Sequence, residues 1–279
     1  MEQYLLSNDV QIPVIGFGTW QTPSDETGVN AVITALQSGY RHIDTAQGYR
    51  NEDIVGKAVK DSGIPREEIF LTSKLDNPNH GYDNTMRSFE RTLEQLGTDY
   101  VDLFLIHWPN PLQYRATWQQ TNAETWKAFE ELYRAGKIRA IGISNFRQHH
   151  IDELMKTAEI TPMVNQIRLC PGEPQEALVG YCRERNILLE AYSPLGTGQI
   201  FKVPEMQALA EKYQKSIAQI CIRWSLQNGF LPLPKSVTAD RIRENIDVFS
   251  FALSDEDVSL IAGLTGCVGL SCDPDTTNW

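Results

Sequence analysis

Short apolar segments alternate with longer amphipathic segments along most of the chain. Eight of the apolar segments have the length and composition of buried β-strands, and they cover residues 14–19, 41–45, 69–74, 101–107, 138–143, 163–168, 187–192 and 230–235. Before them, "YLL" and "VQIPV" flank a turn at Ser7–Asp9, which predicts an N-terminal β-hairpin.

The segments between these strands carry helix signals. Residues 24–39 begin with Ser24 as a cap and end on Gly39, and segments 81–97 and 122–136 also end on glycine. Strands joined by helices predict a parallel sheet, because each parallel crossover needs a dozen or more residues. Eight such units in about 250 residues, without a linker, predict an α/β fold. We expect residues 1–279 to form a single (β/α)8 TIM barrel domain with a short C-terminal tail.

An open, doubly wound sheet is the alternative for the same alternation. That fold binds dinucleotides through a first turn with three spaced glycines. The stretch "GFGTWQ", residues 16–21, has the first two glycines and lacks the third. The barrel is therefore the better interpretation.

The composition narrows the class of protein. Hydrophobic residues make up 41% of the 279 residues, which is enough for a full core. The formal net charge of −11 argues against nucleic acid or an anionic membrane as a general partner. The five cysteines have no C-x-x-C spacing, which favours reduced thiols and no metal site. Because "MEQYLLSNDV" has no signal-peptide pattern and no apolar run is long enough to span a membrane, we expect a cytoplasmic protein.

Polar residues stand at the ends of three neighbouring predicted strands. Asp44 ends one strand and is followed by Tyr49 in the next loop, Lys74 ends the second and His107 the third. The active site of such a barrel lies at the carboxyl ends of its strands. Each residue alone has an ordinary structural explanation, such as a turn cap for Asp44, although lysine is rarely buried without a partner. One site explains all four more simply.

These residue types suit proton transfer to a carbonyl oxygen. A free tyrosine titrates near ~10, and a cation against the phenol lowers that pKa. We expect Lys74 to be that cation, with Asp44 neutralising the buried ammonium and His107 orienting the substrate oxygen. A second agent must deliver hydride, because no side chain can.

The segments around these residues closely resemble the aldo-keto reductase family, in particular compact microbial members such as 2,5-diketogluconate reductase and aldehyde reductases. The segments "GFGTW", "RHIDTAQGYRNEDIVGKAV", "REEIFLTSKL", "DYVDLFLIHWP", "GKIRAIGISNF", "NQI", "AYSPLGTG" and "PKSVTADRIRENIDVF" occur in family order at family spacing over nearly the whole chain. The resemblance implies NADPH-dependent reduction, with Asp44, Tyr49, Lys74 and His107 as the catalytic residues and Tyr49 as the general acid.

The resemblance also implies a cofactor site. Barrels commonly bind phosphate in the loops after their seventh and eighth strands. After residues 230–235 the chain gathers Lys235, Arg241 and Arg243 beside Ser236 and Thr238 at a predicted helix start, which suits an anion. We interpret Arg243 as part of a solvated face. The residues implied to hold the adenosine 2′-phosphate, and hence a preference for NADPH over NADH, are Lys235, Ser236, Arg241 and Asn245.

Other residues follow from the family pattern alone. Ser144, Asn145 and Gln166 are implied to hold the nicotinamide carboxamide, and Tyr192 to stack on the nicotinamide ring. Those implied to border the nicotinamide or lie along the pyrophosphate are Thr19, Trp20, Ser193, Leu195 and Thr197.

The substrate pocket is expected to be aromatic with one polar end, and its lining residues are Trp20, Tyr49, His107 and Trp108. A short segment after "SPLGTG" and a short tail imply an open mouth and relaxed specificity. Many relatives have tryptophan where this chain has Asp76. Trp279 either folds back over the pocket or extends into solvent, the commoner fate of a terminus.

The expected activity is reduction of small-molecule carbonyls, namely aldehydes, 2-oxoaldehydes, keto esters or keto sugars, by a monomer. One alternative is a nucleotide-binding regulatory or structural member of the same fold without turnover, against which the complete set of four residues argues. Another is an unrelated barrel enzyme with a Schiff base on Lys74. Asp44 argues against that enzyme, because it would keep the amine protonated.

Overall fold

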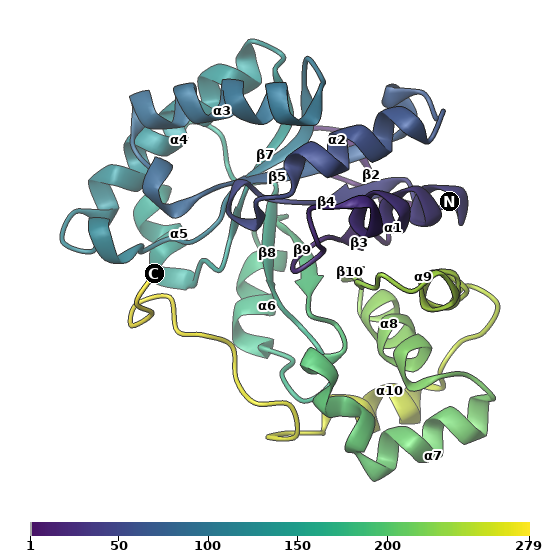
Figure 1. The fold of residues 1–279 in the computed structure, drawn as a ribbon. Helices are drawn as coiled ribbons and strands as arrows, with labels where there is room; N and C mark the ends of the chain where they lie inside the picture. The colour runs from purple at the N-terminus through teal and green to yellow at the C-terminus, as the bar shows by residue number, and fades with distance from the viewer. Residues whose placement is uncertain (1) are drawn as a thin grey trace.

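The computed structural model describes residues 2–279 and contains one eight-stranded parallel sheet and one small hairpin (Figure 1). The hairpin pairs β1 (Gln3–Leu5) with β2 (Gln11–Pro13), as predicted. The parallel strands, in spatial order, are β3 (Phe17–Gly18), β4 (His42–Asp44), β5 (Phe70–Leu75), β6 (Val101–Ile106), β7 (Ile138–Ser144), β8 (Val164–Arg168), β9 (Leu188–Tyr192) and β10 (Leu231–Leu233).

Backbone hydrogen bonds join the two ends of this sheet into a barrel. Gly16 N donates to Pro232 O at 3.1 Å, and Gly18 N donates to Pro234 O at 3.0 Å. A Cβ on Gly18 would lie 3.2 Å from the carbonyl oxygen of Leu233, so glycine permits this close approach. The predicted (β/α)8 barrel is thereby confirmed over the doubly wound alternative.

A ring of helices surrounds the sheet (Figure 1). The helices are α1 (Glu26–Gln37), α2 (Glu52–Asp61), α3 (Tyr82–Leu96), α4 (Trp118–Arg134), α5 (Gln148–Leu154), α6 (Glu176–Arg183), α7 (Pro204–Tyr213), α8 (Ile217–Gln227), α9 (Ala239–Ile246) and α10 (Asp255–Ala262). Two of them, α7 and α10, are additional to the eight strand–helix units of the barrel, and both lie beside α8. Trp224 Nε1 in α8 donates to Val258 O in α10 at 3.3 Å.

The predicted glycine stops are confirmed, and one predicted cap is wrong. Gly39, Gly97 and Gly136 adopt φ of 107°, 62° and 72°, the left-handed region that ends a helix. The cap of α1 is Asp25 instead of Ser24. The Asp25 carboxylate accepts from Thr27 N at 2.8 Å, whereas the Ser24 hydroxyl donates to Asp53 at 3.3 Å. A carboxylate is the stronger acceptor beside a helix N-terminus.

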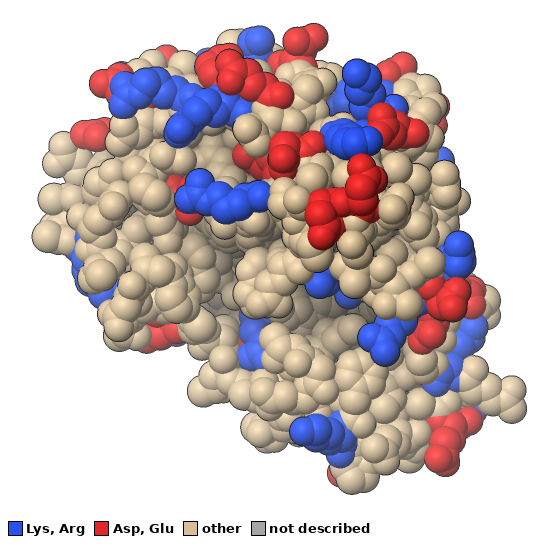
Figure 2. All heavy atoms as spheres, in the orientation of Figure 1, with Lys and Arg blue, Asp and Glu red and all other residues tan. Residues whose placement is uncertain are grey.

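The C-terminal segment returns across the barrel (yellow in Figure 1) from α10 to the neighbourhood of α5. Within residues 2–279, no helix combines the length and apolar character needed to span a bilayer. On the face drawn in Figure 2, acidic and basic side chains are interspersed.

Candidate active site

The four predicted catalytic residues meet at the carboxyl ends of their strands. Asp44 is the last residue of β4, Lys74 lies in β5, His107 follows β6, and Tyr49 ends the short 3-10 helix Gln47–Tyr49. The buried Lys74 ammonium donates to Asp44 Oδ1 at 2.6 Å and to the Tyr49 hydroxyl at 3.2 Å. It also donates to Thr45 O at 3.0 Å, so all three of its protons have partners.

Tyr49 and His107 face each other at the mouth of the barrel. Their rings lie 5.6 Å apart in an edge-to-face arrangement, and both side chains are half-buried. Burial, with the Lys74 charge and His80 adding to its effect, holds the pKa of His107 well below its ordinary value. The imidazole is therefore neutral and can donate one hydrogen bond to an oxygen placed between the two rings.

The net electrostatic effect on Tyr49 corrects the expectation from the sequence. Burial raises the pKa of Tyr49 and outweighs the Lys74 ammonium, which acts to lower it. Burial alone would lower the pKa of Lys74, but Asp44 and Tyr49 together raise it above its ordinary value. The site thus holds a neutral phenol against a permanent ammonium, a state that disfavours a nucleophilic Lys74.

The side chain of Gln47 fixes the loop that carries Tyr49. Its amide nitrogen donates to Ser88 O at 3.2 Å and to Thr92 Oγ1 at 3.0 Å. Its amide oxygen accepts from Asp76 N at 3.0 Å and from Asn79 Nδ2 at 2.8 Å. These bonds tie the loop after β4 to the loop after β5 and to α3.

The residues implied for the carboxamide of nicotinamide are brought together beside His107. Asn145 Nδ2 donates to His107 O at 2.9 Å and to Ser144 Oγ at 3.1 Å, while Asn145 Oδ1 accepts from the Tyr192 hydroxyl at 2.8 Å. Ser144 Oγ donates to Gln166 O at 2.8 Å. The ring of Tyr192 is held in one position by its hydroxyl and is half-buried, as a stacking surface requires.

The remaining residues implied for nicotinamide and pyrophosphate differ in accessibility. Thr19 is wholly buried and its hydroxyl donates to Asp44 O at 2.9 Å, so it braces β4. Trp20 is 51% exposed beside it. Ser193 and Thr197 adopt left-handed φ of 50° and 52° in the loop after β9, in which Leu195 is half-buried.

Three of the residues implied for the 2′-phosphate, Lys235, Ser236 and Arg241, lie at or just before the start of α9, whereas Asn245 is buried in its last turn. Arg241 is exposed and Lys235 is half-buried, with Lys235 Nζ 3.3 Å from Gln21 O. Within residues 2–279 neither cation forms an ion pair, whereas Arg243 pairs with Asp240 at 3.1 Å. Thr238, the cap residue of α9, makes no side-chain capping bond, which leaves first-turn N–H groups for an anion.

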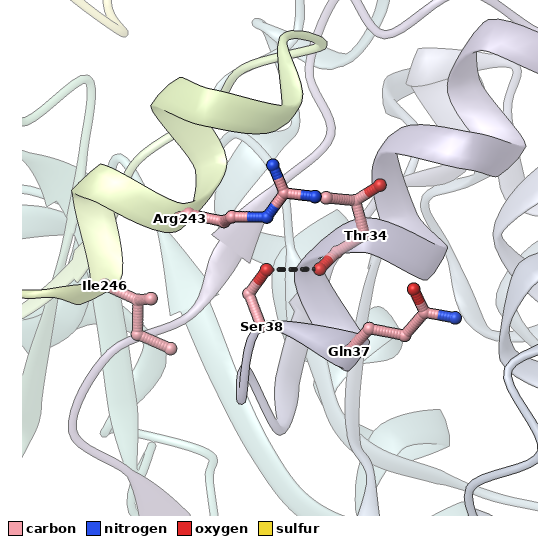
Figure 3. A pocket seen from close by; sticks show the side chains of 5 residues that line it. All are labelled: Thr34, Gln37, Ser38, Arg243 and Ile246. Carbon is pink, nitrogen blue, oxygen red and sulfur yellow. Dashed lines mark hydrogen bonds between the residues drawn. The ribbon is translucent and has the colours of Figure 1, made fainter.

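Arg243 lies apart from this cluster, as the interpretation of a solvated face expects. It lines a shallow groove on the outer helical layer between α1 and α9 (Figure 3). The other lining residues are Thr34, Gln37, Ser38 and Ile246, and Ser38 Oγ bonds to Thr34 O at 2.6 Å. None of the predicted site residues lines this groove.

The sequence analysis missed a buried acid that contacts this site. Glu190 lies in β9 with no exposed surface, and its Oε2 accepts from Gln166 Nε2 at 2.7 Å. The same nitrogen donates to Asp44 Oδ2 at 2.8 Å, which connects Glu190 to the predicted catalytic residues. A charged residue inside the apolar strand "ILLEAY" was the available signal, the same signal that singled out Lys74.

The C-terminal tail folds back over the mouth, which decides between the two alternatives for Trp279. The Trp279 ring lies 5.4 Å from that of Trp108, and Trp279 O accepts from Leu112 N at 3.1 Å. Val268 packs on Gly196, where a Cβ would lie 2.6 Å from a Val268 methyl carbon. The tail therefore covers part of a mouth that its short length predicted to be open.

The rim beside Tyr49 is polar at Asp76. Asp76 Oδ2 accepts from Arg50 Nη2 at 3.1 Å, and Arg50 adopts a left-handed φ of 58° directly after Tyr49. The Arg50 side chain is 78% exposed. The rim on this side thus presents an ion pair.

One group of described residues has potential metal ligands close together. The ligand atoms of His149, His150 and Asp275 all lie within 4.8 Å of one another. His150 Nδ1 accepts from Arg147 N at 3.1 Å, so the neutral ring carries its proton on Nε2 and donates it to Asp275 at 2.9 Å. That tautomer leaves no lone pair on Nε2 for a metal. These contacts instead anchor the tail to α5.

Comparisons with known proteins agree with this geometry. Residues 14–265 match the model of the Aldo/keto reductase family. The chain is 45% identical over 270 residues to a glyoxal reductase of Bacillus subtilis (strain 168), covering 97% of this chain and 95% of that protein.

Two solved structures are also similar over most of their length. The crystal structure of MGS-M4, an aldo-keto reductase from a Medee basin deep-sea metagenome library, superposes with a TM-score of 0.93 at 43% identity and covers 99% of this chain and 100% of that one. A Bombyx mori aldo-keto reductase in complex with NADP superposes with a TM-score of 0.86 at 35% identity and covers 95% and 92%.

Proposed function

The chain belongs to the aldo/keto reductase family, and from that premise we propose that it reduces 2-oxoaldehydes, keto esters or keto sugars to alcohols. It is an NADP-dependent oxidoreductase, and the hydride would come from NADPH when the cofactor is bound. The observation that carries the proposal is the buried Lys74 ammonium, which joins Asp44 at 2.6 Å to the Tyr49 hydroxyl at 3.2 Å.

The side chains supply the rest of the reaction. The neutral His107 imidazole donates a hydrogen bond to the substrate carbonyl oxygen and orients it toward Tyr49. Tyr49 gives its hydroxyl proton to that oxygen, which completes the alcohol. The phenolate left behind lies beside the Lys74 ammonium, and Asp44 keeps the ammonium charged.

Several side chains in the site are suited to bind NADPH. Gln166 uses its amide N–H groups on Asp44 and Glu190, and its Oε1 accepts no hydrogen bond within residues 2–279. This oxygen would accept from the nicotinamide carboxamide. Lys235 and Arg241, unpaired within the same residues, would hold the 2′-phosphate with Ser236 and Asn245.

NADPH consumption by the purified protein tests the proposal directly. Aldehydes, 2-oxoaldehydes, keto esters and keto sugars would be compared at equal concentration, with NADPH binding followed by fluorescence. Turnover of at least one class supports a reductase and ranks its substrates. Tight NADPH binding without turnover on every class would support the regulatory or structural alternative.

We predict that Arg241→Ala weakens NADPH binding about ten- to a hundredfold and changes NADH binding little. A charge-assisted hydrogen bond to phosphate contributes ~1.5–3 kcal/mol, and NADH lacks that phosphate. Fluorescence titration of both cofactors measures the difference. Arg243→Ala is the matched control, because Arg243 lies on the same helix and pairs with Asp240. Equal weakening of both cofactors would contradict the assignment of Arg241.

We predict that Trp279→Ala raises KM for bulky carbonyl substrates about fivefold and leaves NADPH affinity unchanged. The ring packs on Trp108 at the mouth, and an aromatic contact contributes ~1 kcal/mol. Phe249→Ala is the control, since Phe249 is also exposed and lies between α9 and α10. An unchanged KM would show that the tail does not form part of the pocket.

We also propose a cytoplasmic monomer in which residues 1–279 work as a single domain. All predicted site residues come from one barrel, so catalysis needs no second copy. The five cysteines form no disulfide within the described residues, which suits a reducing compartment. Sedimentation equilibrium should give a mass near 31.6 kDa, and a larger mass would contradict the monomer.

A further inference from the structure

Glu190 occupies the centre of a polar network inside the barrel. Its Oε2 accepts from Gln166 Nε2, and its Oε1 has no hydrogen-bond partner within the described residues. We propose that Glu190 is a positioning residue for carbonyl reduction, which orients the amide of Gln166 and controls the charge beneath Tyr49. This inference rests on the proposed roles of Gln166 and Tyr49.

The orientation of Gln166 follows from its two acceptors. Gln166 and Glu190 are directly opposite in the β8–β9 ladder, so the two side chains point to the same face. The amide nitrogen lies 2.7 Å from Glu190 Oε2 and 2.8 Å from Asp44 Oδ2. An amide nitrogen has two protons, and both are used here. The amide oxygen is therefore left to accept from the carboxamide of the cofactor.

The charges around Glu190 explain why its own charge matters. From β4 it faces Asp44 and His42, whose Nε2 lies 3.8 Å from Glu190 Oε1, and from β5 it faces Lys74. Burial lowers the pKa of His42 to about 3, so this ring is neutral. Asp44 and Lys74 neutralise each other. An ionised Glu190 would leave one uncompensated negative charge in the dry interior.

The protonation state of Glu190 therefore changes in the alkaline range. Burial raises the pKa of its carboxyl to about 8, and the Asp44 carboxylate adds to the rise. Below that pH Glu190 is neutral. Above it, the new negative charge raises the pKa of Tyr49 and retains the phenol proton that reduction consumes.

Two substitutions separate the charge of Glu190 from its hydrogen bond. Glu190→Gln keeps an acceptor for Gln166 and cannot ionise, whereas Glu190→Leu removes both. We expect Glu190→Gln to shift the alkaline limb of kcat/KM down by about half to one pH unit. We expect Glu190→Leu to raise the NADPH dissociation constant about fivefold, the effect of one lost hydrogen bond, and Glu190→Gln to raise it less than twofold.

A measurement without cofactor tests the ionisation itself. Unfolded chains release this proton near the ordinary value of 4.5, whereas the folded protein holds it until about pH 8. Between these values the folded state binds more protons, so rising pH destabilises the wild type. The melting temperature of wild type should therefore fall by roughly 5 °C relative to Glu190→Gln between pH 5 and 8. Glu184→Gln replaces an exposed carboxyl, so its melting temperature should change with pH as that of the wild type does.

The outcomes separate this inference from the proposed function. Superimposable pH profiles, parallel melting curves and unchanged NADPH affinity in both variants would overturn the role of Glu190, even if wild type reduces carbonyls. A lower melting temperature in Glu190→Leu alone, with no other change, would reduce Glu190 to a structural residue and also overturn it. If wild type reduces nothing, the reductase assignment fails, and the melting and binding measurements still decide whether Glu190 ionises and orients Gln166.

Discussion

Tyr49→Phe is expected to lower kcat for carbonyl reduction by about a thousandfold and to leave NADPH affinity within twofold of wild type. The substitution removes the hydroxyl that lies 3.2 Å from Lys74 Nζ and keeps the ring that faces His107. General acid catalysis contributes ~10²–10⁴ in rate, so loss of the proposed proton donor should have an effect of that size. Steady-state kinetics and fluorescence titration measure the two quantities.

A second tyrosine provides the control for this substitution. Tyr100 directly precedes β6, at the opposite end of the barrel, and its ring lies 4.2 Å below the Arg66 guanidinium. Tyr100→Phe keeps that ring, so its kcat should equal that of wild type. If Tyr49→Phe retained more than a tenth of the wild-type rate, another group would have to donate the proton.

Lys74→Met is expected to abolish reduction and to lower the free energy of unfolding by about 3–5 kcal/mol. Lys74 and Asp44 are both buried, and removal of one partner leaves the other charge uncompensated in the interior. Urea denaturation followed by circular dichroism gives the stability. The double variant Lys74→Met with Asp44→Asn should recover part of the loss, because it also removes the stranded carboxylate.

An exposed ion pair supplies the comparison for Lys74. Lys57 pairs with Asp61 on the surface of α2, where the two side chains are 52% and 40% exposed. Exposed pairs contribute ~0–1 kcal/mol, so Lys57→Met should be nearly neutral. Equal stabilities of the Lys57 and Lys74 variants would contradict a charged, buried Lys74.

The local sequence pattern was sufficient to predict the architecture of this protein. The spacing of apolar residues within a segment predicts a strand or a helix without reference to distant parts of the chain. Glycines such as Gly39 and Gly97 end helices through their own backbone conformation. The choice of Asp25 over Ser24 as the cap of α1 was missed, because both residue types are common caps and the sequence does not show which side chain reaches the first-turn N–H groups.

Three of the four predicted catalytic residues could be placed together for a simple geometric reason. Parallel strands of a barrel end at one mouth, so residues at strand ends such as Asp44, Lys74 and His107 must be neighbours whatever the loops do. The position of Tyr49 against Lys74 depends on the loop conformation that Gln47 holds, so the sequence could suggest it only from the chemistry of the two side chains and from the resemblance to a family.

Other features depended on contacts between distant parts of the chain. Gln166 lies 122 residues from Asp44 in the sequence, yet one amide connects Asp44 to Glu190 inside the barrel. The net direction of the Tyr49 pKa depends on burial, which is a sum over all surrounding elements, so a nearby lysine could not determine it. The return of Trp279 to Trp108 required anchors on α5 and on loops that no local pattern relates to the tail. Strand ends and helix stops are local properties, whereas charge, burial and tail docking arise only when separate elements pack together.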